Sequence, residues 1–123
     1  MAVQESGEMY LEAIYVLSQK SNSVRAIDVG EYLGYSKPSV SRALGVLKDE
    51  GMVTKNSEGF LSLTQSGEDR AKSIYERHTL LTKLFMNLGV DEETATEDAC
   101  RIEHYISEKT FSALKAHISK YGS

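Results

Sequence analysis

The chain has little of what marks secreted and membrane proteins. Its 123 residues include one cysteine, and no apolar run approaches the roughly 20 residues that a membrane-spanning helix needs. The N-terminal stretch MAVQESGEMY lacks the basic and apolar segments of a signal peptide. One cysteine also excludes an internal disulfide, so Cys100 is a packed thiol, a nucleophile, a metal ligand or an intermolecular bridge. We therefore expect a cytoplasmic protein, and a reducing cytosol favours the first three roles.

The basic excess of most nucleic-acid-binding proteins is also missing. The formal net charge is −4, which counts mildly against a DNA-binding protein because lysine and arginine are needed to displace counterions from phosphates. The charges are unevenly distributed, since residues 1–20, 21–63 and 64–123 carry net charges of −2, 0 and −2. Any DNA contact should therefore lie in the middle segment.

The rest of the composition is that of an ordinary globular protein. Hydrophobic residues make up 41% of the chain and charged residues 26%, which argues against disorder. The length allows one ordinary core, or two small lobes that stabilise each other.

The first half of the chain predicts a helix-turn-helix. Apolar residues recur at helical spacing over residues 8–19, and a second helix is expected over residues 26–33, with Gly34 ending it. Ser36 fits the N-cap of a third helix, and Pro38 falls in its first turn, where a missing N–H costs nothing. Two helices joined by so short a turn are typical of a helix-turn-helix.

A small hairpin and three more helices are expected after it. Residues 52–55 and 60–63 have a strand pattern on either side of the turn signal NSEG, and a hairpin in this place is the wing of a winged helix. Helical pattern then covers residues 65–87, part of the segment 91–109, and residues 108–121. The sequence therefore predicts a mainly α fold.

Seven residues are candidates for DNA contact. The second helix of a helix-turn-helix lies in the major groove, where its N-terminal residues reach base edges and nearby donors hold phosphates. The same residues could be the solvated face of a winged helix that binds protein, but the run before Arg42 lacks acids and a wing follows. The candidates are Ser36, Lys37, Pro38, Ser39, Ser41, Arg42 and Lys55.

The stretch ACRIEH contains three side chains that can bind a metal. On a helix, Cys100, Glu103 and His104 stand at i, i+3 and i+4 and share one face, although such a face can also be plain surface. His78 interrupts the apolar stripe of the long helix, and taken alone it fits a hydrogen-bonded core histidine better than a ligand.

Met9 and Glu12 are a second anomaly, at i and i+3 beside the apolar stripe of the first helix. Separately they could be core filler and a solvated charge. If all these side chains converge, their sulfur, nitrogen and oxygen donors suit Fe²⁺, Co²⁺, Ni²⁺ or Zn²⁺ better than Ca²⁺ or Mg²⁺. The candidate metal ligands are Met9, Glu12, His78, Cys100, Glu103 and His104.

Catalysis fits this cluster poorly, so we expect no enzyme. A Cys–His pair on one helix lacks an orienting third group and an oxyanion hole, and a hydrolytic metal site needs a cleft that the chain has little length to build. A redox switch would need a second thiol. The remaining alternative is a metal-independent winged-helix module that binds a protein, with Cys100 and His78 as core residues.

Five motifs in order resemble one family over nearly the whole chain. EMYLEAIYVL, YSKPSVSRALGVLKDEGMV, LTQSGEDRA, ERHTLL and DACRIEH are similar to the metal-dependent transcriptional repressors of the diphtheria toxin repressor family. The resemblance implies a homodimer that binds a palindromic operator when loaded with Fe²⁺ or Mn²⁺ and shuts off metal uptake. It also implies a winged helix-turn-helix DNA-binding domain over residues 1–70 and a helical dimerisation and metal-binding domain over residues 71–123.

The resemblance assigns ligands from both branches of the family. Met9, Cys100, Glu103 and His104 match the primary site of the iron-sensing branch, and His78 matches a ligand in both branches. Glu12 matches a ligand of the manganese-sensing branch, in which Asp would replace Met9 and Glu would replace Cys100.

The remaining matches distinguish this chain from the iron branch. Thr82 and Thr96 stand where that branch has the Glu and His of an ancillary site. Since the sequence stops at Ser123, the resemblance implies the short form without an SH3-like domain. Sulfur ligands favour Fe²⁺ over Mn²⁺. We therefore expect an Fe²⁺ sensor that Mn²⁺ activates at higher concentration.

Overall fold

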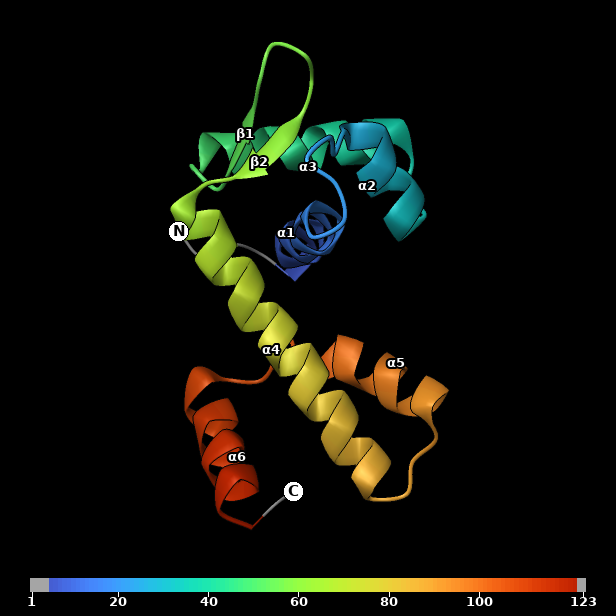
Figure 1. Ribbon diagram of the computed structural model, residues 1–123, viewed down its shortest axis with the longest axis vertical. Helices are drawn as coiled ribbons and strands as arrows, with labels where there is room; N and C mark the ends of the chain where they lie inside the picture. The colour runs from blue at the N-terminus through green and yellow to red at the C-terminus, as the bar shows by residue number, and fades with distance from the viewer. Residues whose placement is uncertain (1–4, 122–123) are drawn as a thin grey trace. The chain divides into compact units, whose positions relative to one another are not determined.

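The computed structural model describes residues 5–121, over which the chain forms six helices and a two-stranded sheet (Figure 1). The expected mainly α fold is confirmed. The ends of the two expected domains, residues 1–4 and 122–123, lie outside the described residues. The elements are α1 (Glu5–Ser18), α2 (Ala26–Leu33), α3 (Lys37–Asp49), β1 (Val53–Lys55), β2 (Leu61–Leu63), α4 (Gln65–Asn87), α5 (Glu92–Ile102) and α6 (Glu108–Tyr121).

Helices α2 and α3 form the expected helix-turn-helix within the first of two compact units, which runs up to Lys72. Gly34 ends α2 with φ +75°, a left-handed conformation that glycine adopts without strain, and its N–H donates to the Gly30 carbonyl at 2.8 Å. The Ser36 hydroxyl caps α3 by accepting the Ser39 N–H at 3.4 Å. Both helix ends are therefore where the sequence predicts them.

The hairpin after α3 is the wing. Its strands pair antiparallel, with Val53 opposite Leu63 and Lys55 opposite Leu61, and the turn projects beyond α3 (Figure 1). The Leu61 N–H also donates to the Val24 carbonyl at 2.7 Å. This bond ties the wing to the segment that leads into α2.

An apolar core holds the first unit together. It draws on α1, the helix-turn-helix, both strands and the start of α4, and burial of such side chains is the main favourable term in folding. Its buried members are Tyr10, Leu11, Ala13, Ile14, Val24, Val29, Val40, Leu44, Leu47, Val53, Leu61 and Ala71.

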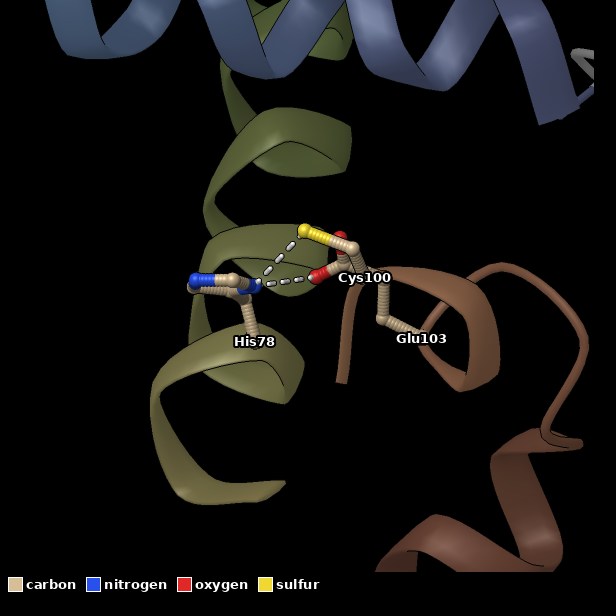
Figure 2. Close-up of side chains that lie close together, drawn as sticks. All are labelled: His78, Cys100 and Glu103. Atoms are coloured by element: carbon tan, nitrogen blue, oxygen red, sulfur yellow. Dashed lines mark hydrogen bonds and ion pairs between the residues drawn. The ribbon is translucent and has the colours of Figure 1, made fainter. Parts of the chain in front are cut away.

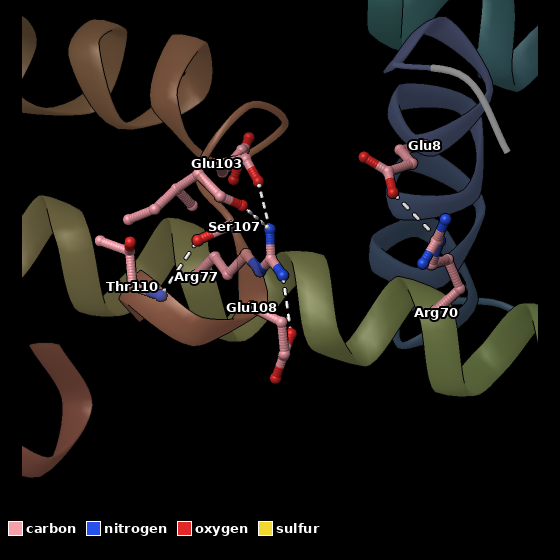
Figure 3. A network of polar contacts seen from close by, with 8 residues as sticks. Glu8, Arg70, Arg77, Glu103, Ser107, Glu108 and Thr110 are labelled. Atoms are coloured by element: carbon pink, nitrogen blue, oxygen red, sulfur yellow. Dashed lines mark hydrogen bonds and ion pairs between the residues drawn. The ribbon is translucent and has the colours of Figure 1, made fainter. Parts of the chain in front are cut away.

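The start of α4 packs tightly against this unit. A Cβ atom added to Gly67 would lie 2.0 Å from the Met52 carbonyl oxygen, so only glycine fits at this point of the helix. Farther along α4, the Arg70 guanidinium lies 3.0 Å from the buried Glu8 carboxylate on α1 (Figure 3). The guanidinium offsets the charge of Glu8, which allows this carboxylate to be buried.

The second unit runs from Ser73 and contains the rest of α4 with α5 and α6. Its buried apolar side chains are Ile74, Leu81, Ala95, Ala99 and Phe111. Leu88 is 70% exposed, because α4 ends at Asn87 and the chain turns at Gly89. No helix within residues 5–121 is long and apolar enough to cross a membrane.

Candidate metal centre and DNA-binding surface

Three of the predicted ligands meet in the second unit. Cys100 Sγ lies 3.7 Å from His78 Nδ1, and Glu103 Oε2 lies 3.3 Å from the same nitrogen (Figure 2). One sulfur, one nitrogen and one oxygen ligand atom all lie within 4.8 Å of one another. A single divalent ion could therefore bind all three.

The end of α5 places two of these side chains. Asp91 starts the helix by accepting the Thr94 N–H at 2.9 Å, and this bond holds the pKa of the Asp91 carboxyl below its usual value. The helix ends at Ile102, but Glu103 keeps helical angles, φ −57° and ψ −28°, and therefore stays one turn from Cys100 on the same face.

His104 departs from the expected helical face. It lies in the turn that follows α5, because the helix ends two residues before it. Its Nε2 atom is nevertheless 3.6 Å from Glu103 Oε1. The Glu103 carboxylate thus lies between two imidazoles, with Oε2 toward His78 and Oε1 toward His104.

The burial of Glu103 supports a metal at this place. Its side chain is 1% exposed, and apart from His78 Nδ1 at 3.3 Å, no donor among the described residues contacts Oε2. A buried carboxylate is costly unless a hydrogen bond, a cation or a metal compensates it. The side chains present therefore fit a bound cation, and the mixture of thiolate, imidazole and carboxylate fits a first-row ion such as Fe²⁺ or Zn²⁺ better than Ca²⁺ or Mg²⁺.

The same neighbours change the protonation of His78. Hydrogen bonds with Cys100 and Glu103 raise the pKa of His78 to about 10, although partial burial acts in the opposite direction. At neutral pH the ring is therefore protonated when no metal is bound. Since a histidine binds metal as neutral imidazole, metal binding must release this proton.

Met9 and Glu12 lie in the first unit. Both are half-buried on α1, three residues apart and therefore on one face of the helix. The Met9 sulfur accepts a hydrogen bond from the Tyr35 hydroxyl at 3.8 Å, and Tyr35 stands in the turn between α2 and α3. Met9 is therefore more than core filler, since its sulfur makes a polar contact with the helix-turn-helix.

Thr82 and Thr96 are half-buried on α4 and α5. No hydrogen bond reaches the buried Thr82 hydroxyl among the described residues. Neither side chain can supply the carboxylate or the imidazole of the iron branch's ancillary site.

The reading of Cys100 and His78 as core residues is wrong. Cys100 is exposed, and the His78 side chain is 22% exposed and faces polar neighbours. The alternative of a metal-independent module therefore loses its structural basis.

All seven candidate DNA contacts are exposed. Six lie at the start of α3, whose opposite face buries Val40, Leu44 and Leu47, and Lys55 lies on β1. The hydroxyls of Ser36 and Ser39 lie 3.0 Å apart and hydrogen-bond to each other. The seven residues are therefore exposed on the same elements, a second helix and a wing, that contact DNA in winged helix-turn-helix proteins.

The structure adds Arg25, which the sequence patterns did not single out. It is the exposed N-cap residue of α2, and its guanidinium lies 4.6 Å from the centre of the Phe60 ring at the wing. In the sequence, the signal was an arginine at a helix N-cap, a position that usually has a small side chain with a hydrogen-bond acceptor. The main chain of Arg25 is held by Asp28, whose carboxylate accepts the Arg25 N–H at 2.9 Å, while the charge of the exposed guanidinium suits a phosphate.

Comparison with known proteins agrees with these two sites. The family model described as "Iron dependent repressor, N-terminal DNA binding domain" matches residues 2–59, and "Iron dependent repressor, metal binding and dimerisation domain" matches residues 64–121. The transcriptional regulator MntR of Escherichia coli O157:H7 is 32% identical over 114 residues, which cover 93% of this chain and 74% of that protein.

Two further relatives are longer than the matched region. The diphtheria toxin repressor of Corynebacterium diphtheriae is 29% identical over 85% of this chain and 47% of its own length. The structure of the manganese regulator SloR is similar over 97% of this chain and 55% of that chain, with 28% identity and a TM-score of 0.82. The chain thus spans about half the length of these two relatives. These relatives are regulators rather than enzymes, and the chain belongs to the diphtheria toxin repressor family of metal-dependent transcriptional repressors.

Proposed function

We propose that this protein is an Fe²⁺-activated repressor of metal-uptake genes that responds to Mn²⁺ second. It acts in the cytoplasm as a homodimer on a palindromic operator. The observation that carries the proposal is the cluster of His78, Cys100 and Glu103, in which a thiol, an imidazole and a buried carboxylate meet within 4.8 Å.

The proposed ligand set extends this cluster. His104 belongs to it because its ring faces the second oxygen of Glu103. Met9 and Glu12 share one face of α1 and would add a thioether and a carboxylate from the first unit. Sulfur donors favour Fe²⁺ over Mn²⁺, which prefers oxygen and nitrogen, and Co²⁺, Ni²⁺ or Zn²⁺ would substitute in vitro.

We propose that the exposed start of α3 reads the operator. Ser36, Lys37, Pro38, Ser39, Ser41 and Arg42 are the residues nearest the base edges and flanking phosphates, and Lys55 contacts phosphate from the wing. Arg25 adds a phosphate contact at the start of α2, since the Phe60 ring holds its guanidinium at the exposed side of the wing.

Residues 71–123 provide the proposed dimer contact. An apolar groove between α4 and α6 is lined by Leu80, Leu84 and Ile118, and Leu88 is exposed beyond the end of α4. Exposed apolar side chains of this kind are buried when two copies associate. A twofold dimer would present two α3 helices to two operator half-sites.

The proposed mechanism depends on ligands from both units. Met9 and Glu12 of the first unit would hold the ion together with the ligands of the second unit, and these coordination bonds would favour the arrangement of units that binds DNA. A ligand can shift such an equilibrium only by its differential affinity for the two states. Without metal, the protonated His78 ring would pair with Glu103, and no coordination bond would join the ligands of α1 to those of the second unit.

The test is DNA binding with and without a chelator. A duplex selected from a random-sequence pool by the Fe²⁺-loaded protein serves as the probe, and fluorescence anisotropy reports binding under anaerobic conditions. We expect chelation to weaken binding at least about tenfold, a coupling of ordinary allosteric size. Circular dichroism should show that the chelated protein remains folded.

Equal binding with and without chelator would contradict the proposal. The metal content of the purified protein separates it from the alternative, a metal-independent winged-helix protein-interaction module. A protein that retains no divalent metal after anaerobic loading and desalting would support the alternative.

A further inference from the structure

Arg77 on α4 makes an unusually complete set of contacts within the second unit. Its Nη1 atom donates to the Glu103 carbonyl at 3.0 Å and to the Ile106 carbonyl at 2.9 Å, and its Nη2 atom donates to Glu108 Oε2 at 2.8 Å (Figure 3). The guanidinium carbon also lies 5.5 Å from the centre of the buried Phe111 ring. Its side chain is 12% exposed, and the buried Nε atom has no hydrogen-bond partner among the described residues, so the two Nη atoms make all three bonds.

The carbonyls that Arg77 binds need an outside donor. Helix α5 ends at Ile102, and the last carbonyls of a helix have no partner within it. Arg77 supplies donors to two carbonyls of the segment that joins α5 to α6, and its third bond reaches Glu108, the first residue of α6. One guanidinium thus fixes both ends of this turn, which an arginine can do because its donors form a rigid planar fork.

Arg77 and His78 are neighbours in the sequence, and both contact Glu103, one at its main chain and the other at its side chain. Arg77 binds the main-chain carbonyl of Glu103, while His78 lies 3.3 Å from its carboxylate. The Glu103 N–H is bound as well, to the Ala99 carbonyl at 2.9 Å. The main chain of Glu103 is therefore fixed on both sides, which sets the direction in which its side chain leaves the turn.

We propose that Arg77 is a positioning residue of the metal site, which holds Glu103 and the adjoining His104 in the arrangement that binds the ion. The inference rests on the proposed metal-binding function and adds a residue outside the ligand set. Loss of outer contacts that orient a ligand typically weakens metal binding by about 10- to 100-fold.

The second unit also contains a matched control. Lys115 on α6 lies 2.6 Å from Glu76 on α4, so this ion pair joins the same two helices as the Arg77–Glu108 pair. Both of its side chains are about half exposed, and neither belongs to the cluster of metal-binding side chains. Removing Lys115 therefore loosens α6 without changing the support of Glu103.

The experiment measures Co²⁺ binding by the metal-free protein and by the variants R77M, R77K, E108Q and K115M. Absorption in the visible and near-ultraviolet reports the coordination geometry and the thiolate bond, while urea unfolding of each metal-free variant reports stability. Co²⁺ is the probe because its spectrum changes with the placement of its ligands, which a purely structural loss of stability does not alter.

We expect R77M to bind Co²⁺ at least about tenfold more weakly than the parent and with an altered spectrum. R77K should fold and also lose affinity, because an ammonium group cannot reproduce the three-way fork. E108Q keeps both carbonyl bonds, and K115M keeps all Arg77 contacts, so both should stay within about twofold of the parent, as expected for exposed ion pairs.

Several results would overturn the inference. If folded R77K and R77M bind Co²⁺ within about twofold of the parent, with unchanged spectra, Arg77 supports the fold alone. R77K decides the matter if R77M does not fold. An affinity loss in K115M equal to that in R77M would also contradict the proposal. Failure of the parent protein to bind Co²⁺ would refute the proposed metal-binding function itself, together with this inference.

Discussion

At the scale of single residues, the proposed metal preference depends on two sulfur atoms. The Cys100 thiol lies 3.7 Å from His78 in the cluster of the second unit, and the Met9 thioether lies on α1 in the first unit. Polarisable sulfur ligands suit Fe²⁺ better than Mn²⁺, which binds weakly to most donors and prefers oxygen and nitrogen. In the proposed site, Glu12 and Glu103 would supply oxygen donors that both ions accept.

Exchanging the sulfur ligands for carboxylates should therefore change the metal response. In the double variant M9D/C100E, we expect the ratio of the Fe²⁺ and Mn²⁺ concentrations that half-saturate DNA binding to shift toward Mn²⁺ by about tenfold or more. Anaerobic fluorescence anisotropy with the selected duplex gives both concentrations.

The variant H117Q is the control, because His117 is exposed on α6 and its ring contacts that of Tyr121 at a tilt of 46°. Its metal preference should equal that of the parent protein. A double variant that keeps the parent's preference for Fe²⁺ would show that sulfur does not set the selectivity.

Sequence patterns identified residues whose relation is local in the chain and missed residues whose partners are distant in the chain. The i, i+3 spacing of Cys100 and Glu103 is local, so it correctly predicted that they share a face. Arg25 and Arg77 act through partners about 30 residues away in the chain, the Phe60 ring and the turn after α5. No periodicity reports such contacts.

At the scale of elements, local signals predicted most of the helices. The bounds of α2, α4 and α6 match the expected ranges, because capping residues and apolar spacing determine them. The expected helix over residues 8–19 instead runs from Glu5 to Ser18, since its polar first turn lacks an apolar pattern. The helix containing ACRIEH ends before His104, and nothing in its spacing marks that end.

Gly67 offers a test of how α4 joins the first unit. Because a Cβ atom there would lie 2.0 Å from the Met52 carbonyl oxygen, we expect G67A to lower the free energy of unfolding by about 1–3 kcal/mol through overpacking. Urea unfolding followed by circular dichroism measures the change.

Gly45 is the matched control, since it also lies in a helix but has open space around its Cα atom. There the same substitution should raise the free energy of unfolding by about 0.5–1 kcal/mol, because alanine loses less conformational entropy. Equal effects of G67A and G45A would mean that the close approach to Met52 does not restrict position 67.

At the scale of the whole molecule, composition is a poor guide to partners. A net charge of −4 argued mildly against DNA binding, yet the chain belongs to a family of DNA-binding repressors. The distribution of charge was more informative, since the middle segment is neutral and contains the exposed residues at the start of α3. In the proposed dimer, bound metal cations would reduce the net negative charge of the protein and so assist its approach to the phosphates of DNA.

The central claim is that a divalent metal, Fe²⁺ before Mn²⁺, controls DNA binding by this protein. The most direct measurement is an anaerobic titration of the metal-free protein and the selected duplex with each ion, followed by anisotropy. We predict weak binding without metal and half-saturation by Fe²⁺ at a concentration at least about tenfold lower than by Mn²⁺. Tight binding without metal, or half-saturation by Mn²⁺ at the same or a lower concentration than Fe²⁺, would contradict the claim.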